Sequence, residues 1–143
     1  PMIRLSLACL ALCAAAAPAL AGDVTVTLKG VEARGGDVSA VLNTAGTFMR
    51  GADYIASAPG DTPGDVVLTF RDVVPGDYAL MVMHDANSNG RFDMGPSGMP
   101  DEGFAFSNKG QPLMGMPTFE GLKFTVGTDG VALVEPMTYM SPR

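Results

Sequence analysis

Apolar and polar residues alternate along most of this chain, and no other feature constrains the fold as strongly. A period of two sends successive side chains to opposite faces, which is typical of a strand with one buried face. No stretch has the i, i+3, i+4, i+7 apolar spacing over the length that a helix needs, although residues 47–54 could form a short helical turn. The alternating segments are 24–29, 38–43, 66–71, 78–82, 122–126 and a last one that runs from 131 toward Tyr139.

Glycine and proline separate these segments. Gly35-Gly36 and residues 127–130 predict tight hairpin turns, and Pro75-Gly76 predicts a type II turn, because proline presets φ and glycine accepts a positive φ. About seven short strands joined by such turns predict a single antiparallel β-sandwich. Three segments rich in glycine, proline and small or polar residues predict loops, namely 44–64, 85–100 and 109–117.

The N-terminal residues resemble an export signal rather than part of the fold. Arg4 precedes an apolar run over 5–17, Pro18 ends the run, and residues 19–21 read Ala-Leu-Ala, which fits signal peptidase. Cleavage after Ala21 predicts a signal peptide over 1–21 and one β-sandwich domain over 22–143. Both cysteines leave with the signal, so we expect no disulfide in a periplasmic or extracellular product.

The balance of acidic and basic residues limits the classes of partner that this chain could bind. The chain carries 15 acidic and 9 basic residues, for a formal net charge of −6. This balance argues against nucleic acid, whose phosphates require clustered Lys and Arg. No later apolar run is long enough to cross a membrane, so we expect no membrane insertion after cleavage. We expect a monomer whose partner is an unidentified protein or glycan of the cell envelope.

One polar loop has the spacing of a calcium site. Oxygen-bearing side chains stand at its positions 1, 3, 5 and 9, and glycine stands at position 6. A chain that wraps around Ca²⁺ turns alternate side chains inward, and glycine permits the sharp bend. The Asx-turn alternative needs no metal, because Asn and Asp also bond to nearby backbone N–H groups. The residues are Asp85, Asn87, Asn89, Asp93 and Gly90.

The remaining ligands of this loop are less regular. Arg91 would donate its backbone carbonyl, but position 12 is Pro96 and not the glutamate of an EF-hand. A further carboxylate would come from Asp101 or Glu102. With few carboxylates we expect a modest affinity for Ca²⁺, with Kd of about 10⁻⁴ to 10⁻³ M, as in extracellular modules.

His84 and the methionines offer a second interpretation. His84 is in register with the inward side chains of 78–82, so we expect it at the core-facing end of its strand; the alternatives are a metal ligand or a ligand-contacting group. Thioethers suit Cu(I), so His84 and the loop methionines could form a periplasmic copper site. The loop methionines are Met94, Met99, Met114 and Met116.

Residues that could carry catalysis are scarce. The chain has one histidine and no G-x-S-x-G motif, and no serine is placed beside His84. We therefore expect no enzyme, and a small hydrolase of envelope material is the weakest alternative. Phe104 and Phe106 share one strand face and are expected in the core, with carbohydrate stacking as the alternative. Asn108 is expected to cap the calcium loop or to contact a ligand.

Three segments together resemble a known family. They are Val-Val-Pro-Gly-Asp-Tyr-Ala at 73–79, His-Asp-x-Asn-x-Asn-Gly-x-Phe-Asp at 84–93, and Gly-Met-Pro-x-Glu-Gly-Phe-Ala-Phe-Ser-Asn at 98–108. They resemble the secreted bacterial family called domain of unknown function 2141, with Phe92 in place of an aliphatic residue and Ala105 where glycine is frequent. The resemblance implies an exported single domain of immunoglobulin-like or prealbumin-like type. The Pro-Gly-Asp-Tyr segment also resembles carboxypeptidase regulatory-like domains and surface-protein B-repeats, and some of those repeats carry similar calcium loops.

Together these features predict an exported, non-catalytic β-sandwich module with a Ca²⁺-organised loop, acting as a binding or structural accessory of the cell envelope.

Overall fold

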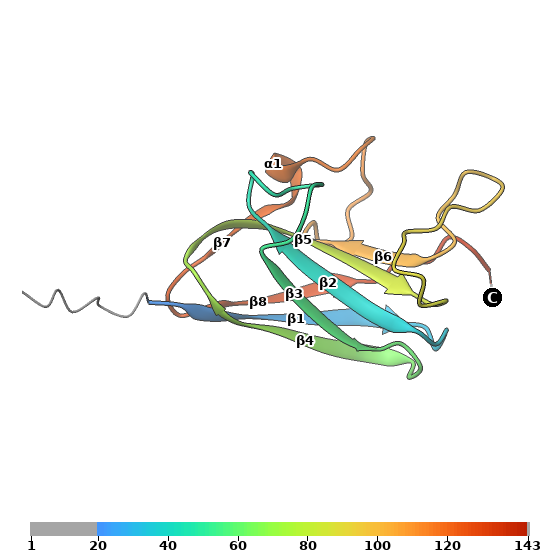
Figure 1. The fold of residues 1–143 in the computed structure, drawn as a ribbon, viewed down its shortest axis with the longest axis horizontal. Coiled ribbons are helices and arrows are strands. Elements are labelled where there is room, and N and C mark those ends of the chain that lie inside the picture. Colours follow the sequence, from blue (N-terminus) through green and yellow to red (C-terminus); the bar gives the residue numbers. More distant parts are fainter. Residues whose placement is uncertain (1–19, 143) are drawn as a thin grey trace, which may run out of the picture.

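Two β-sheets packed face to face form the body of the protein (Figure 1). The computed structural model describes residues 20–142, so the predicted signal peptide lies outside the described residues except for its last two positions. No described helix is long and apolar enough to cross a membrane. The elements are β1 Gly22–Val31, β2 Asp37–Asn43, β3 Tyr54–Pro59, β4 Gly64–Val73, β5 Gly76–Asp85, β6 Gly103–Phe106, α1 Phe119–Leu122, β7 Lys123–Val126 and β8 Val131–Pro136.

The smaller sheet has the strand order β4-β1-β8, and the larger sheet has the order β3-β2-β5-β6. β5 is the central strand of the larger sheet. One of its edges pairs with β2, while its other edge pairs with β7 over residues 76–79 and with β6 over residues 81–84. The predicted β-sandwich is confirmed. The described residues form eight strands, and the pair β1–β8 is parallel whereas the others are antiparallel.

The alternation seen in the sequence corresponds to the two faces of these strands. The apolar members of each alternating segment point between the sheets, and burying each one fully contributes about 1.5–3 kcal/mol. The residues at the centre of this core are 0–5% exposed: Val24, Val26 and Leu28 on β1, Val38, Ala40 and Leu42 on β2, Leu68 and Phe70 on β4, and Tyr78, Leu80 and Val82 on β5.

The predicted turns occupy the expected places but connect different sheets. Gly35-Gly36 lies between β1 and β2, and residues 127–130 lie between β7 and β8, yet in both cases the flanking strands belong to opposite sheets. Neither is a hairpin turn, because a hairpin joins two paired strands. The type II turn at Pro75-Gly76 is also wrong, since Gly76 has no positive φ and begins β5.

The loop predicted over 44–64 contains a strand. β3 pairs antiparallel with β2 along its whole length, and only residues 44–53 connect the two. Tyr54, Ala56 and Ala58 form its half-buried face. Alanine and serine have little intrinsic preference for strands, so pairing with β2, rather than local preference, decides this segment.

A buried carboxyl on β8 provides a test of this packing. Glu135 is 2% exposed, and its Oε2 accepts a hydrogen bond of 2.8 Å from the backbone N–H of Lys109. Burial raises the pKa of Glu135, although the Lys109 N–H and charge act in the opposite direction. Because the folded-state pKa is the higher one, the contribution of Glu135 to the free energy of unfolding is complete at pH values below its pKa in the unfolded state. This contribution is lost as the pH rises through its pKa in the folded state.

We therefore expect Glu135→Gln to raise the free energy of unfolding at pH 7 by up to about 1 kcal/mol, because the amide oxygen keeps the Lys109 bond without a buried charge. Urea unfolding between pH 4 and 8 measures this difference. The gain of the variant over the parent should shrink as pH falls and Glu135 takes up a proton. A gain that is independent of pH would contradict the explanation.

Candidate metal-binding loop

The candidate loop connects β5 to β6 and leaves the larger sheet at the end of the molecule where the C-terminus lies (Figure 1). Asp85 is the last residue of β5 and is 8% exposed. Its Oδ1 accepts from the backbone N–H of Asn89 at 3.1 Å, and its Oδ2 accepts from that of Gly90 at 2.7 Å. Gly90 has φ of +72°, which allows the chain to turn back around the carboxylate.

The asparagines close the loop around Asp93. Asn87 Oδ1 accepts from the Asn89 N–H at 3.1 Å, and Asn89 Oδ1 accepts from the Arg91 N–H at 2.8 Å. Their Nδ2 groups both donate to Asp93 Oδ2, at 2.8 and 2.6 Å, and these bonds lower the pKa of Asp93. The structure thus joins the side chains of Asn87 and Asn89 to that of Asp93, while the Asp85 carboxylate is bonded to the backbone of the same loop. The bonds from the asparagine Oδ1 atoms to backbone N–H groups are Asx turns.

Of the two acids proposed beyond the loop, Glu102 is the one that turns into it. Glu102 is 4% exposed, and its Oε2 accepts from the Asp93 N–H at 3.4 Å. Burial raises the pKa of Glu102, as do the charges of Asp85 and Asp93, while backbone N–H groups lower it. Its Oε1 is buried and has no hydrogen-bond partner within residues 20–142. Asp101 is exposed, and its side chain lies against Gly95.

The donor set has the chemistry of a hard-cation site. Three carboxylates and two side-chain amides offer only oxygen ligands of the kind that Ca²⁺ accepts. Among residues 20–142, no three His, Cys, Asp or Glu side chains form a metal cage by themselves. A cation here would therefore need the oxygens of the asparagines and of the backbone as well. The role predicted for the Arg91 carbonyl stays a prediction.

His84 precedes this loop, but its side chain lies in the protein interior and is bonded to other segments. It is fully buried, as its register predicted. Its Nε2 donates to the Gly35 carbonyl at 2.8 Å, because a carbonyl can only accept, and its Nδ1 lies 2.8 Å from the Tyr139 hydroxyl. That hydroxyl also accepts from the Glu32 N–H at 3.1 Å. Both ring nitrogens are thus engaged in joining β5 to the β1–β2 connection and the C-terminal segment.

Asn108 caps its own turn. Its Nδ2 donates to the Gln111 carbonyl at 2.7 Å, and within the described part of the chain it has no recorded hydrogen bond to the 85–93 loop. It also lines a cavity of about 420 Å³ beside β6. Its predicted contact with a ligand stays a prediction.

The sequence predicts Phe104 and Phe106 in the core, and this prediction is wrong. Ala105 takes the inward position at 3% exposed, so the two phenylalanines lie on the outer face of the larger sheet. There they line a second cavity, of about 510 Å³, together with Met81 and Met83 of β5. Sequence reasoning did not identify this cavity. The sequence does contain an indication of it, because segments 80–83 and 103–106 carry apolar residues at positions that face both sides of the sheet.

The fold and site define a two-sheet β-sandwich with a polar, oxygen-rich loop at one end of its central strand. A family model described as an uncharacterized protein conserved in bacteria, domain of unknown function 2141, matches residues 26–133, and the chain belongs to this family. No curated protein and no solved structure is significantly similar to it.

Proposed function

We propose that this protein is an exported, non-catalytic binding module whose β5–β6 loop is organised by Ca²⁺. The observation that carries the proposal is the Oε1 atom of Glu102, which is buried without a hydrogen-bond partner among the described residues, in a carboxyl whose pKa the charges of Asp85 and Asp93 also raise. A buried, unpaired acceptor costs about 1–3 kcal/mol, and more when charged. A divalent cation would offset that cost and would also reduce the repulsion among Asp85, Asp93 and Glu102.

The loop geometry supports the proposal in a second way. Asp85 accepts the N–H of Gly90 at position 6, so the backbone already encircles the first carboxylate. Asp93, Asn87 and Asn89 already meet through their side chains. A cation would compete with the two amide donors for Asp93 Oδ2, and this competition is consistent with the modest affinity expected from the sequence. Bound Ca²⁺ would supply positive charge and a fixed loop shape for a partner in the cell envelope.

We expect Ca²⁺ to raise the thermal stability of EDTA-treated protein, with little response to Mg²⁺, which prefers a stricter octahedral shell. A ligand that binds only the native state stabilises it by RT ln(1 + [L]/Kd), or about 2.7 kcal/mol at a hundredfold excess over Kd. Differential scanning calorimetry across a Ca²⁺ titration measures this response.

Two neighbouring variants sharpen the experiment. Glu102→Gln should abolish the Ca²⁺ response, and in EDTA it should be as stable as the parent or more stable, because a buried charge is removed. Asp101→Asn is the matched control: it removes the adjacent but exposed carboxylate and should leave the response unchanged. Equal responses in both variants, or no response to Ca²⁺ in the parent, would overturn the proposal.

The other candidates are weaker on this geometry. A copper site at His84 would have to displace Tyr139 or Gly35 from a ring nitrogen of a fully buried side chain. Adding Cu(I) in the same calorimetric experiment tests that alternative. For a hydrolase, no serine is bonded to His84 among the described residues.

A further inference from the structure

The outer face of the larger sheet is apolar where a sandwich usually presents polar side chains to water. On β5, the inward residues Leu80 and Val82 are buried, but Met81 and Met83, which follow them in turn, are also apolar and point outward. On the paired strand β6, Phe104 and Phe106 do the same, and their rings lie 5.6 Å apart. Contiguous apolar surface of this kind marks binding sites on soluble proteins.

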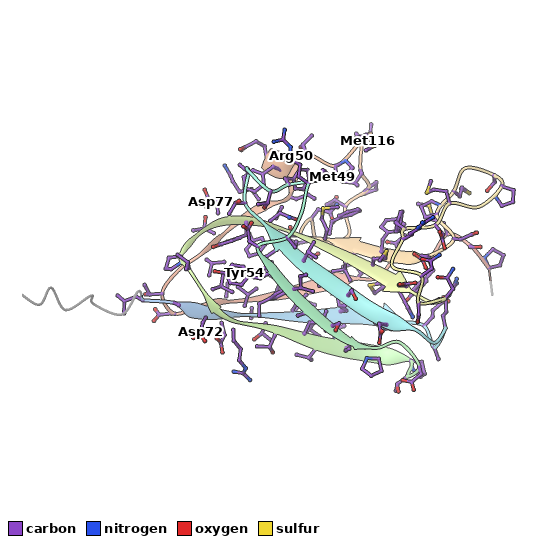
Figure 2. The ribbon with its side chains drawn as sticks, viewed as in Figure 1. Met49, Arg50, Tyr54, Asp72, Asp77 and Met116 are labelled. Carbon is purple, nitrogen blue, oxygen red and sulfur yellow. The ribbon has the colours of Figure 1, made fainter. Side chains whose placement is uncertain are left out.

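Loops surround this surface and turn it into a cavity of about 510 Å³. The 44–53 connection contributes Met49, the β5–β6 loop contributes Phe92 and Met94, and the segment before α1 contributes Met116. Figure 2 shows Met49 and Met116 together near α1. A cavity of this size is in the range that holds a single small molecule, which is about 300–1,000 Å³.

The lining determines the chemistry of an occupant. In the described part of the chain, five methionines and three phenylalanines line the cavity, and the Ser39 hydroxyl is the only polar side-chain group among its lining residues. A sugar or nucleotide would lose its hydrogen bonds to water there without replacement. Methionine side chains are flexible and polarizable, so they adapt to an occupant without a fixed shape. An aliphatic chain meets these conditions.

Two arginines that are sequence neighbours of lining residues favour an anionic head group on that chain. Arg50 follows the lining residue Met49, and Arg91 precedes the lining residue Phe92; both arginines are exposed. Figure 2 shows Arg50 and Met49 together near α1. Neither forms an ion pair among residues 20–142. In a chain of net charge −6, these two cations favour a carboxylate over a cationic amphiphile, and the charge of Arg91 also acts on Asp93.

We propose that this cavity binds one fatty acid, with its aliphatic chain against Met81, Met83 and the β6 phenylalanines. The inference goes beyond the proposed function and rests on it at one point, which is the wall formed by residues 92–94. There Asp93 joins the polar loop, whereas Phe92 and Met94 line the cavity and Phe92 packs edge-on against Phe104 with ring centres 6.0 Å apart. Ordering the loop with Ca²⁺ would therefore also order this wall and tighten fatty-acid binding.

The test is a fluorescence titration of the purified protein with cis-parinaric acid, followed by displacement with palmitate or hexadecanol. We expect saturable binding of one molecule, and stronger displacement by palmitate than by hexadecanol. Val41→Glu, which places a charge in the cavity, should weaken binding by about tenfold or more. Val67→Glu, on the outer face of the other sheet, is the matched control and should bind as the parent does.

A second pair avoids the risk that a strand variant fails to fold. Met116 lines the cavity and Met114, in the same loop, is 99% exposed and does not. Met116→Glu should weaken binding and Met114→Glu should not. Absence of saturable binding in the parent, or equal affinity within each pair, overturns the inference.

Two further arms separate the alternatives. The double variant Met81→Leu/Met83→Leu keeps the apolar lining but removes two thioethers, so it should still bind parinarate. Loss of binding together with a Cu(I) or Ag(I) response only in the parent would assign the cavity to a soft metal and overturn the inference. If parinarate binds equally well in EDTA and in Ca²⁺, the fatty-acid site is supported, but the predicted tightening of binding by Ca²⁺ is wrong. A Ca²⁺ response without parinarate binding overturns the fatty-acid site alone.

Discussion

His84→Ala should lower the free energy of unfolding by about 2–4 kcal/mol, because it empties a fully buried position and leaves polar groups unpaired. The Gly35 carbonyl would lose its donor, and the Tyr139 hydroxyl would lose the ring nitrogen 2.8 Å away. The space around the ring is tight, since a Cβ at Gly60 would lie 2.3 Å from Nε2. Chemical denaturation at constant pH measures the change.

Tyr139→Phe is the partial counterpart of this variant. It removes only the hydroxyl that bonds to His84 and accepts the Glu32 N–H, so a loss of about 1–2 kcal/mol is expected. The double variant should lose less than the sum of the two single losses, because both remove the same bond. Strict additivity would show that the two side chains are not coupled. A loss below about 1 kcal/mol for His84→Ala would contradict the explanation from burial and unpaired polar groups.

Gly36→Ala should be as damaging for a different reason. Gly36 has φ of +61°, and a Cβ there would lie 1.9 Å from the Asp85 carbonyl oxygen. The backbone must move at the point where β2 pairs with the end of β5, so we expect a loss of about 3 kcal/mol or more. Because Asp85 begins the candidate loop, the variant should also weaken the Ca²⁺ response.

Gly30→Ala separates the two causes of that loss. Gly30 has φ of +70°, but a Cβ there would meet nothing within 4 Å. It should therefore cost only the conformational strain of about 1–2 kcal/mol. Thermal unfolding of both variants gives the comparison, and similar losses would mean that the contact with Asp85 is relieved at no cost.

The sequence alone was sufficient for β1, β2, β4 and β5 and for their inward faces. Alternation at Val24, Val26 and Leu28 identifies a half-buried strand without knowledge of its partner, because the period of two belongs to the strand itself. The same reasoning placed His84 on the inward face of β5. The spacing of Asp85, Asn87, Asn89 and Asp93 also predicted that these side chains would meet, because a loop with glycine at its sixth position returns upon itself.

Only the tertiary structure decided which strands pair and what the outward faces do. The sequence Gly35-Gly36 is compatible both with a hairpin between β1 and β2 and with a crossing from one sheet to the other. Which of the two forms depends on the pairing of β1 with β4 and of β2 with β5, and these partners are far away in sequence. β3 is a strand because β2 lies beside it. Phe104 and Phe106 were assigned to the core because they are apolar, but Ala105 fills that position and the rings face outward. A pattern of period two separates the two faces of a strand without saying which of them is buried. The apolar cavity exists because the tertiary structure places the loops 44–53, 86–102 and 109–117 over the outer face of β5 and β6.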